Sequence, residues 1–271
     1  FDNENDYISD NNIRDMMIVA VNPEDINQWY VGTWGSGILE FQNGEIVNRY
    51  TESNSPLQGS AETNGPAVSA LQYDDNNNLW VTNGYSETPL LVVSPEGDWT
   101  ALSAVNAGAG GSDLYADMII SQLGYKWIVR PRGHGLVVYN DNNTPFDDTD
   151  DEAVAITNQV GQGNLPTMDV FSIAEDLNGE IWVGTGEGVA VFYNSGGVFS
   201  GNNFDAQQIL LEQDGNIQIL LETENVTSIQ VDGANRKWLG TSNSGVFLMS
   251  PDGTEEIYHF TSTPATLHLA H

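Results

Sequence analysis

Five copies of one tryptophan-centred pattern lie along this chain. Each copy has a tryptophan near the start of a short apolar run, then a glycine-containing turn, then a second apolar run. The aligned tryptophans, which lie 47 to 56 residues apart, are Trp29, Trp80, Trp127, Trp182 and Trp238. Self-similarity at such a spacing is typical of an array of stacked supersecondary units.

A second element precedes each tryptophan. It is an alternating run followed by a turn rich in Asp, Asn and Gly, as in VFSIAEDLNGE at 170–180. Period-two alternation predicts a strand, and these turn residues suit a tight hairpin. Further strands follow the second apolar run, for example at 45–50 and 255–260. Each repeat therefore predicts four short antiparallel strands.

Four-stranded units of this size bury both faces by stacking on one another, and repeats of about 40 to 50 residues are typical of β-propeller blades. We therefore predict an all-β chain that forms a single β-propeller over residues 1–271, with the five tryptophans as structural wedges between blades. The blades are expected at about 12–50, 67–102, 114–157, 170–221 and 226–260, with a tail at 261–271. A closed five-bladed ring and a partial arc of a seven-bladed propeller both stay open.

The pattern I-x-x-D-x-x-G-x-x-W-V-G-T-x-x-G-V at 173–189, and the linkers at 49–57 and 161–170, carry a family resemblance. They resemble the two-component regulator propeller (Reg_prop) repeat. Within that family, 21–57 and 173–260 are similar to the second propeller of PorZ-like proteins of the type IX secretion system of Bacteroidetes. The periplasmic glycan-sensing propeller of hybrid two-component sensor kinases is the alternative.

The resemblance implies a parent protein at the cell surface, outside the outer membrane, that helps to attach cargo to anionic lipopolysaccharide. It also implies two seven-bladed propellers and a C-terminal signal domain. The five repeats of this chain depart from that pattern and favour a partial propeller. An incomplete ring would expose strand edges, so an edge-to-edge dimer is expected in that case.

The charge balance argues against some partners. There are 7 Lys and Arg against 38 Asp and Glu, a formal net charge of −31, which disfavours nucleic acids and anionic membrane surfaces. There is no cysteine, which excludes disulfides and thiolate chemistry. No run approaches the roughly 20 apolar residues of a membrane-spanning helix. Composition does not fix the compartment, and the family resemblance implies an extracellular or periplasmic binding protein.

No motif for catalysis stands out. Carboxylate pairs such as Asp74–Asp75 and Glu175–Asp176 lie in predicted turns, where Asp is an ordinary turn former. The GTGEG stretch at 184–188 lies in a predicted hairpin and not at the helix N-terminus that a phosphate loop needs. We therefore expect a non-enzymatic protein with no cofactor.

One acidic segment, FDDTDDE at 146–152, invites a metal interpretation. Asp148, Asp150 and Glu152 alternate and offer oxygen ligands of the kind calcium prefers. The segment lacks the glycine and terminal glutamate of an EF-hand loop. A solvated loop is the simpler interpretation, and bound calcium is the alternative.

A candidate ligand site comes from the turns between the second and third strands of each blade, which share one face of a propeller. Arg130, Arg132 and His134 form the densest basic group, and arginine binds carboxylate or phosphate in a bidentate manner. Trp34 and Tyr85 lie in equivalent turns and offer rings for stacking on sugars. An anionic-glycan site is the hypothesis, and internal counter-ions for carboxylates are the alternative for the arginines.

Overall fold

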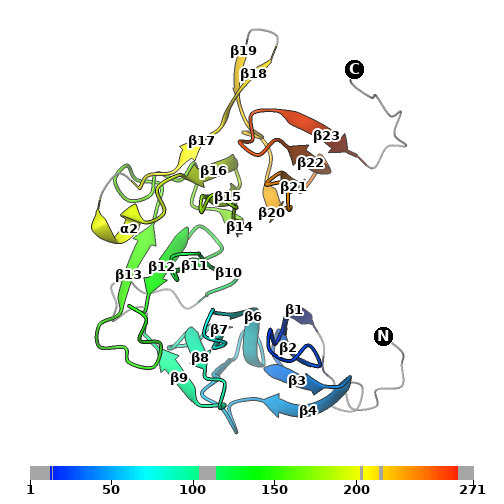
Figure 1. Ribbon diagram of the computed structural model, residues 1–271, viewed down its shortest axis with the longest axis vertical. Helices are drawn as coiled ribbons and strands as arrows, with labels where there is room; N and C mark the ends of the chain where they lie inside the picture. The colour runs from blue at the N-terminus through cyan, green and yellow to red at the C-terminus, as the bar shows by residue number, and fades with distance from the viewer. Residues whose placement is uncertain (1–12, 14, 104–113, 202–203, 214–215, 262–271) are drawn as a thin grey trace. The chain divides into compact units, whose positions relative to one another are not determined.

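The structure is a computed structural model that describes residues 13, 15–103, 114–201, 204–213 and 216–261 (Figure 1). The described residues divide into two compact units. The first comprises 1–130 with 137–155, and the second comprises 131–136 with 156–271. Each unit is described by itself below.

The first three sheets in chain order are antiparallel, and neighbouring strands follow one another in sequence. Their strands are β1 Met16–Val21, β2 Gln28–Thr33, β3 Ile38–Gln42 and β4 Glu45–Tyr50; β5 Gly59–Ser60, β6 Gly65–Tyr73, β7 Leu79–Gly84, β8 Leu90–Val93 and β9 Trp99–Leu102; and β10 Met118–Ile120, β11 Lys126–Val129, β12 Leu136–Asn140 and β13 Glu152–Ile156.

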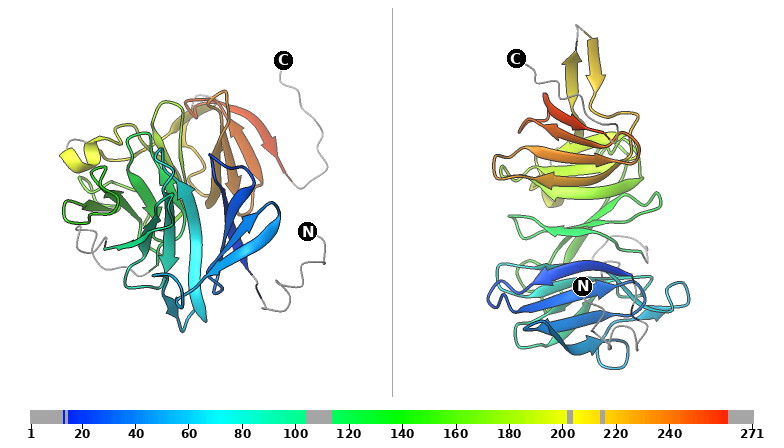
Figure 2. Two further views of the ribbon diagram at one scale, coloured as in Figure 1. Left: turned by 60° about the horizontal axis from the view of Figure 1, so that its bottom comes forward. Right: turned by 90° about the vertical axis from the view of Figure 1, so that its right-hand side faces the viewer.

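The later sheets repeat the scheme, with one short helix and one added hairpin. Their elements are β14 Val170–Glu175, β15 Ile181–Thr185, β16 Gly188–Phe192, α2 Gly197–Ser200 and β17 Gln207–Gln208; the hairpin β18 Leu210–Gln213 and β19 Asn216–Ile219; and β20 Val226–Val231, β21 Lys237–Thr241, β22 Val246–Met249 and β23 Glu256–Phe260. The hairpin projects from the second unit in the right-hand view of Figure 2. The predicted all-β fold of four-stranded antiparallel sheets is confirmed, whereas ring closure stays a prediction.

The first two strands of several sheets share one register, including a bulge at the same place. Ala20 pairs with Tyr30, Gln72 with Trp80, Ala174 with Trp182, and Gln230 with Trp238. Since cross-strand partners share a face of the sheet, these four aromatic residues occupy equivalent positions. Trp127, opposite Ile119, is the corresponding residue of β11.

This register corrects the prediction for the first repeat. Trp29 is not the equivalent of the other blade tryptophans; Tyr30 is. Residues 29–33 read WYVGT, while 182–185 read WVGT, so aligning on the letter W shifts the first repeat by one residue. Such a shift moves a side chain to the opposite face of a strand. Trp29 lies half-buried and stacks on Phe41 with ring centroids 5.4 Å apart.

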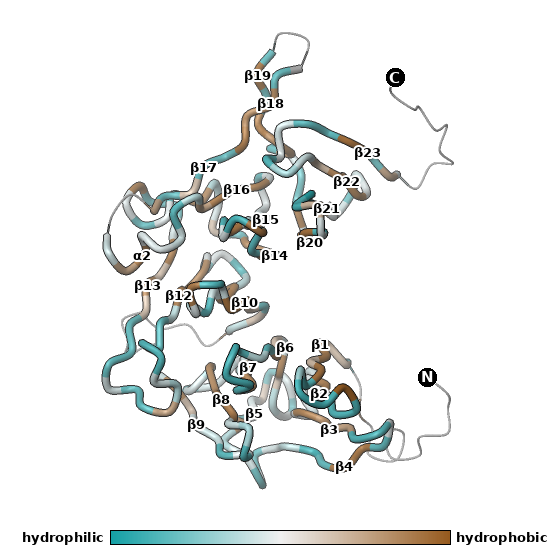
Figure 3. Tube along the Cα trace, in the orientation of Figure 1, coloured by the Kyte–Doolittle hydropathy of each residue, from teal (hydrophilic) through white to brown (hydrophobic). Residues whose placement is uncertain are grey.

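The core of each unit lies between its sheets. In the first unit Trp80, Val92, Ile128 and Tyr139 belong to one buried cluster, and hydrophobic stretches run along β6 and β8 (Figure 3). In the second unit the face of β14–β17 that carries Trp182 packs on Ile229, Leu239, Phe247 and Met249 of β20–β23. Trp80, Trp127 and Trp182 are fully buried, as expected for structural wedges, whereas Trp238 is only partly buried.

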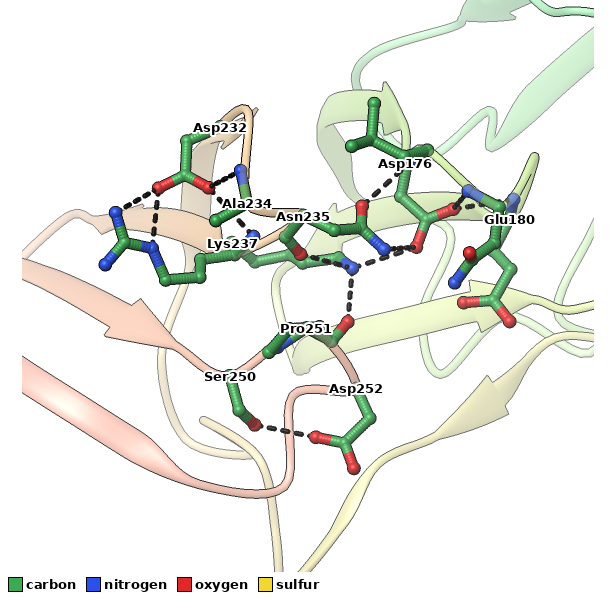
Figure 4. A network of polar contacts seen from close by, with 12 residues as sticks. Asp176, Glu180, Asp232, Ala234, Asn235, Lys237, Ser250, Pro251 and Asp252 are labelled. Carbon is green, nitrogen blue, oxygen red and sulfur yellow. Dashed lines mark hydrogen bonds and ion pairs between the residues drawn. The ribbon is translucent and has the colours of Figure 1, made fainter.

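A buried lysine covers two of these tryptophans. Lys126 Nζ lies 3.8 Å from the ring centroid of Trp80, and Lys237 Nζ lies 4.5 Å from that of Trp182. Figure 4 shows Lys237 donating to Asp176 Oδ2 at 2.8 Å and to the carbonyl oxygens of Asn235 and Pro251. Each lysine precedes the tryptophan of its own strand, so that it faces the tryptophan of the preceding sheet.

Candidate functional site

The turn between β2 and β3 brings two of the predicted ligand-binding residues together. Trp34 continues β2 and makes an isolated bridge to Ala67, while Tyr85 follows β7 with a left-handed backbone, φ 58°. Their rings meet edge to face, with centroids 6.1 Å apart. Both side chains are half-buried and leave part of their surface for a ligand.

The three residues of the predicted basic group, Arg130, Arg132 and His134, differ in their exposure to solvent. Arg130 directly follows the fully buried β11 and is only 6% exposed, which corrects the expectation that it stands on the rim. Burial lowers the pKa of Arg130, and the neighbouring phenol of Tyr115 opposes this effect. Arg132 and His134 are exposed, and Arg132 adopts a left-handed backbone, φ 63°.

The acidic segment does not gather its predicted ligands. Across the described residues no three His, Cys, Asp or Glu side chains are grouped to hold a metal ion, and Asp148, Asp150 and Glu152 do not form such a group. Asp150 Oδ1 accepts a hydrogen bond from Thr144 Oγ1 at 2.8 Å and so helps to close its own loop.

Asp151 of the same segment is a titratable group that the sequence interpretation missed. It accepts a hydrogen bond from the buried phenol of Tyr139. Burial raises the pKa of Asp151 to about 6; the bond from Tyr139 lowers it, and the nearby carboxylates of Asp141, Asp150 and Asp148 raise it. The signal in the sequence was the density of carboxylates, which does not tell that Asp151 is the half-buried one that meets Tyr139.

A polar pocket of about 420 Å³ in the first unit contains a basic residue that sequence reasoning also missed. Arg49, near the end of β4, lies beside the β2–β3 turn and the β5–β6 hairpin. The pocket is lined among others by Gly35, Arg49, Glu52, Ser60, Asn64 and Gly65.

The two loops that frame the pocket meet backbone to backbone. Gly35 and Gly65 have positive φ values of 98° and 140°, and an added Cβ on either would lie 2.3 Å from a carbonyl oxygen of the opposite loop. Gly35 N donates to the Pro66 carbonyl at 3.0 Å. Glycine is required because this approach leaves no room for a side chain.

Arg49 is held at one nitrogen. Its Nε donates to the Ser36 carbonyl at 3.0 Å, and Ser36 N donates to Thr33 Oγ1 at 3.0 Å. In contrast to Lys126, Lys237 and Arg236, which pair with Asp141, Asp176 and Asp232, Arg49 makes no ion pair with any described carboxylate. An arginine held in this way can offer its two terminal nitrogens to a planar oxyanion.

Comparisons with known proteins agree with this fold. Residues 164–187 match the family described as Two component regulator propeller. No curated protein sequence matches the chain. In the part of the chain that the structure describes, no helix is long and apolar enough to cross a membrane.

Among solved structures, PorZ, an essential bacterial surface component of the type IX secretion system of Porphyromonas gingivalis, is similar over 93% of this chain, with 26% identity and a TM-score of 0.81. The extracellular domains of two B. thetaiotaomicron regulatory systems, described as hybrid two component systems, match with 16% and 14% identity and TM-scores of 0.57 and 0.59. The matched regions cover 87% and 88% of this chain and 27% of each of the two solved chains. At this sequence identity the two structures show the fold alone.

The chain spans 35% of the length of the PorZ structure. The family match and the structural likeness converge on one description: the chain has a β-propeller type of fold, contains a two component regulator propeller repeat and is similar in structure to PorZ.

Proposed function

We propose that this chain is a non-enzymatic binding module of a cell-surface component of a type IX secretion system. Its ligands would be protein partners or an anionic glycan such as lipopolysaccharide. The observation that carries the proposal is the likeness to PorZ, at a TM-score of 0.81 and 26% identity over nearly the whole chain. The two-component extracellular domains are more distant on both measures.

The chemistry of the described residues fits binding better than catalysis. The Trp34–Tyr85 pair offers aromatic surface, and the Arg49 pocket offers a cation in a chain with a formal net charge of −31. Fixed aromatic faces and arginine forks bind sugars and oxyanions without bond cleavage. Location at the cell surface or in the periplasm and function without a cofactor belong to the same proposal.

The alternative is a periplasmic glycan-sensing propeller of a hybrid two-component sensor, which the likeness in fold to the B. thetaiotaomicron domains keeps open. The two functions differ in ligand. A sensor takes short soluble glycan fragments, whereas a surface component takes polymeric anionic lipopolysaccharide or other secretion proteins.

Binding to the purified chain tests the proposal. Anionic lipopolysaccharide from a bacterium with type IX secretion, a neutral polysaccharide and a set of short oligosaccharides would be passed over the immobilised chain at about 0.15 M salt, where exposed charges act over about 8 Å. We expect saturable binding of the anionic lipopolysaccharide. Binding of a short neutral oligosaccharide alone would favour the sensor. Binding of none, together with no capture of secretion components, would overturn the proposal.

A further inference from the structure

We propose that the Arg49 pocket binds a monoanionic sugar acid, with the sugar carboxylate on Arg49 and its hydroxyl groups on Glu52 and Asn64. The inference rests on the proposed binding function and names the ligand chemistry of one site within it. Arg49 is the basic residue that lines this pocket. Among the other described basic residues, Lys126, Lys237 and Arg236 are paired with carboxylates, Arg130 is buried, and Arg132 does not line the pocket.

Arg49 supplies the anion-binding group. The bond from its Nε to the Ser36 carbonyl orients the guanidinium, and its terminal nitrogens make no hydrogen bond to any described residue. Two parallel N–H donors match the two oxygens of a carboxylate, and charge-assisted pairs of this kind are about twice as strong as neutral hydrogen bonds. The side chain is partly buried, which reduces the screening of such a pair by water.

Glu52 and Asn64 make the pocket selective for a hydroxylated ligand. Glu52 Oε1 lies so close to Gly59 that an added Cβ there would be 2.0 Å from it, which places this carboxylate against the pocket wall. A carboxylate accepts hydrogen bonds from sugar hydroxyls, and the carboxamide of Asn64 both donates and accepts. Asn64 is exposed and makes no side-chain hydrogen bond to a described residue.

The charge of the chain also distinguishes between classes of anion. A ligand with one negative charge is attracted by Arg49 and repelled by Glu52. A phosphate monoester, with a charge close to −2 at neutral pH, doubles both of these interactions, so that the remaining acidic surface, in a chain with a formal net charge of −31, disfavours the dianion. The pocket therefore suits a hexuronic acid better than a sugar phosphate.

Titration of the intact chain followed by NMR tests the assignment. The probes are D-glucuronic acid as the monoanion, glucose as the neutral sugar and glucose 6-phosphate as the dianion, at pH 7.5. We expect glucuronic acid to shift the Arg49 Nε–H and the amides of Gly35, Gly59 and Gly65, with weaker effects of the other two probes. The variant Arg49→Gln should reduce the affinity for glucuronic acid at least about tenfold, because it removes a charge-assisted pair.

Two further variants keep the test decisive. Asn64→Gly preserves the left-handed backbone (φ 55°) while removing the carboxamide, so a loss of a few fold is expected without loss of folding. Arg236→Gln removes the same charge at a partly exposed arginine that pairs with Asp232 and does not line the pocket, and it should leave the affinity unchanged.

The outcomes test the Arg49 pocket and the proposed function of the chain separately. Equal affinity of the native chain, Arg49→Gln and Asn64→Gly for glucuronic acid, or tighter binding of glucose 6-phosphate, would overturn the pocket. If anionic lipopolysaccharide still binds in that case, the proposed function stands while the pocket fails. If glucuronic acid binds at Arg49 but lipopolysaccharide and secretion components do not bind, the pocket stands and the proposed function fails.

Discussion

Each unit contains a tryptophan covered by a buried lysine, but the aspartates that pair with the two lysines lie in different places. Lys126 covers Trp80 and pairs with Asp141, which directly follows β12 of the sheet that holds Lys126. Lys237 covers Trp182 and pairs with Asp176, which lies in the turn after β14 and so belongs to the neighbouring sheet. The first ion pair is internal to a sheet; the second joins two sheets.

The difference extends to the tryptophan nitrogens. Trp80 Nε1 donates to Asp74 Oδ2 at 3.0 Å, at the turn that precedes its own strand. The equivalent Asp176 Oδ2 is taken by Lys237 Nζ and Asn235 Nδ2, and Trp182 Nε1 has no acceptor among the described residues. The aspartate of this turn can therefore accept a hydrogen bond from the tryptophan of its own sheet, as Asp74 does, or pair with a lysine of the next sheet, as Asp176 does.

The largest expected effect is on the pair that joins the two sheets. Asp176→Ala removes bonds to Lys237, Asn235 and the backbone N–H groups of Asn178 and Glu180, and leaves a fully buried ammonium. A loss of about 3–5 kcal/mol in the free energy of unfolding is expected, as for other broken buried ion pairs. Urea unfolding followed by tryptophan fluorescence measures it.

Asp141→Ala is the matched change in the first unit. Lys126 keeps the attraction of Asp74 and Asp151, and burial already lowers the pKa of Lys126, so that it loses its proton more readily than an exposed lysine. We expect a smaller loss, about 1–3 kcal/mol. Equal losses at Asp141 and Asp176 would contradict the distinction between a pair within a sheet and a pair across two sheets.

The residue two positions after the tryptophan gives the second test. Thr82 stands there in the first unit, and its hydroxyl donates to the Ala116 carbonyl at 3.1 Å. In the second unit the residue is Gly184, where an added Cβ would lie 2.4 Å from the Val226 carbonyl oxygen of the next sheet. Gly184→Ala should cost about 1–3 kcal/mol through overpacking.

Gly240, at the same register position beside the partly exposed Trp238, is the control for Gly184. An added Cβ there would meet only the side-chain hydroxyl of Ser228 closely, which can rotate away. Gly240→Ala should cost well under 1 kcal/mol by thermal or urea unfolding. A similar cost at both glycines would show that the lysine-covered face is not the tighter one.

Replacing each tryptophan by phenylalanine isolates the indole hydrogen bond. Both Trp80→Phe and Trp182→Phe lose similar buried volume, but only Trp80→Phe loses a hydrogen bond, the one to Asp74. Trp80→Phe should therefore be the more destabilising by about 1 kcal/mol. The reverse order in urea unfolding would indicate that Trp182 Nε1 finds an acceptor in solution.

The smallest effect is expected in the dependence of stability on pH. The pKa of Asp151 is raised from 3.8 to about 6, so the folded chain binds this proton more tightly than the unfolded chain, and stability rises as pH falls from about 7 towards 4. Asp151→Asn should flatten the slope of the urea midpoint between pH 7 and pH 5. An unchanged slope would contradict a raised pKa at the half-buried Asp151.

Asp176 changes the stability with pH in the opposite direction to Asp151. Burial would raise its pKa, but the bonds from Lys237 and from the backbone N–H groups of Glu180 and Asn178 bring it below 3.8 overall. Its stabilisation is therefore present above about pH 4 and lost as pH falls through the lowered pKa. Urea midpoints of native chain and Asp176→Asn should converge below that pH.

Much of the fold could be predicted because patterns among neighbouring residues determine the strands and turns. Alternating strands, the Asp turns and the period of the repeats are properties of neighbouring residues, and the structure confirms the antiparallel sheets that they indicate. The residues of the candidate site were harder to predict from the sequence. Trp34 and Tyr85 do meet, yet Arg130, the strongest candidate by charge density, is buried, and Arg49 lines a pocket without having stood out.

The sequence by itself determined the strand-and-turn repeat, since periodicity two and turn chemistry act within a few residues. Only the tertiary structure decided that Tyr30 and not Trp29 occupies the blade position, because a shift of one residue reverses the face of a strand and the pairing of Gly32 with Ile18 sets that shift. It likewise decided that Lys237 binds an aspartate of another sheet and that Arg49 keeps its terminal nitrogens available. Burial and pairing of charges depend on which sheets and loops come together, and residues far apart in the chain supply those neighbours.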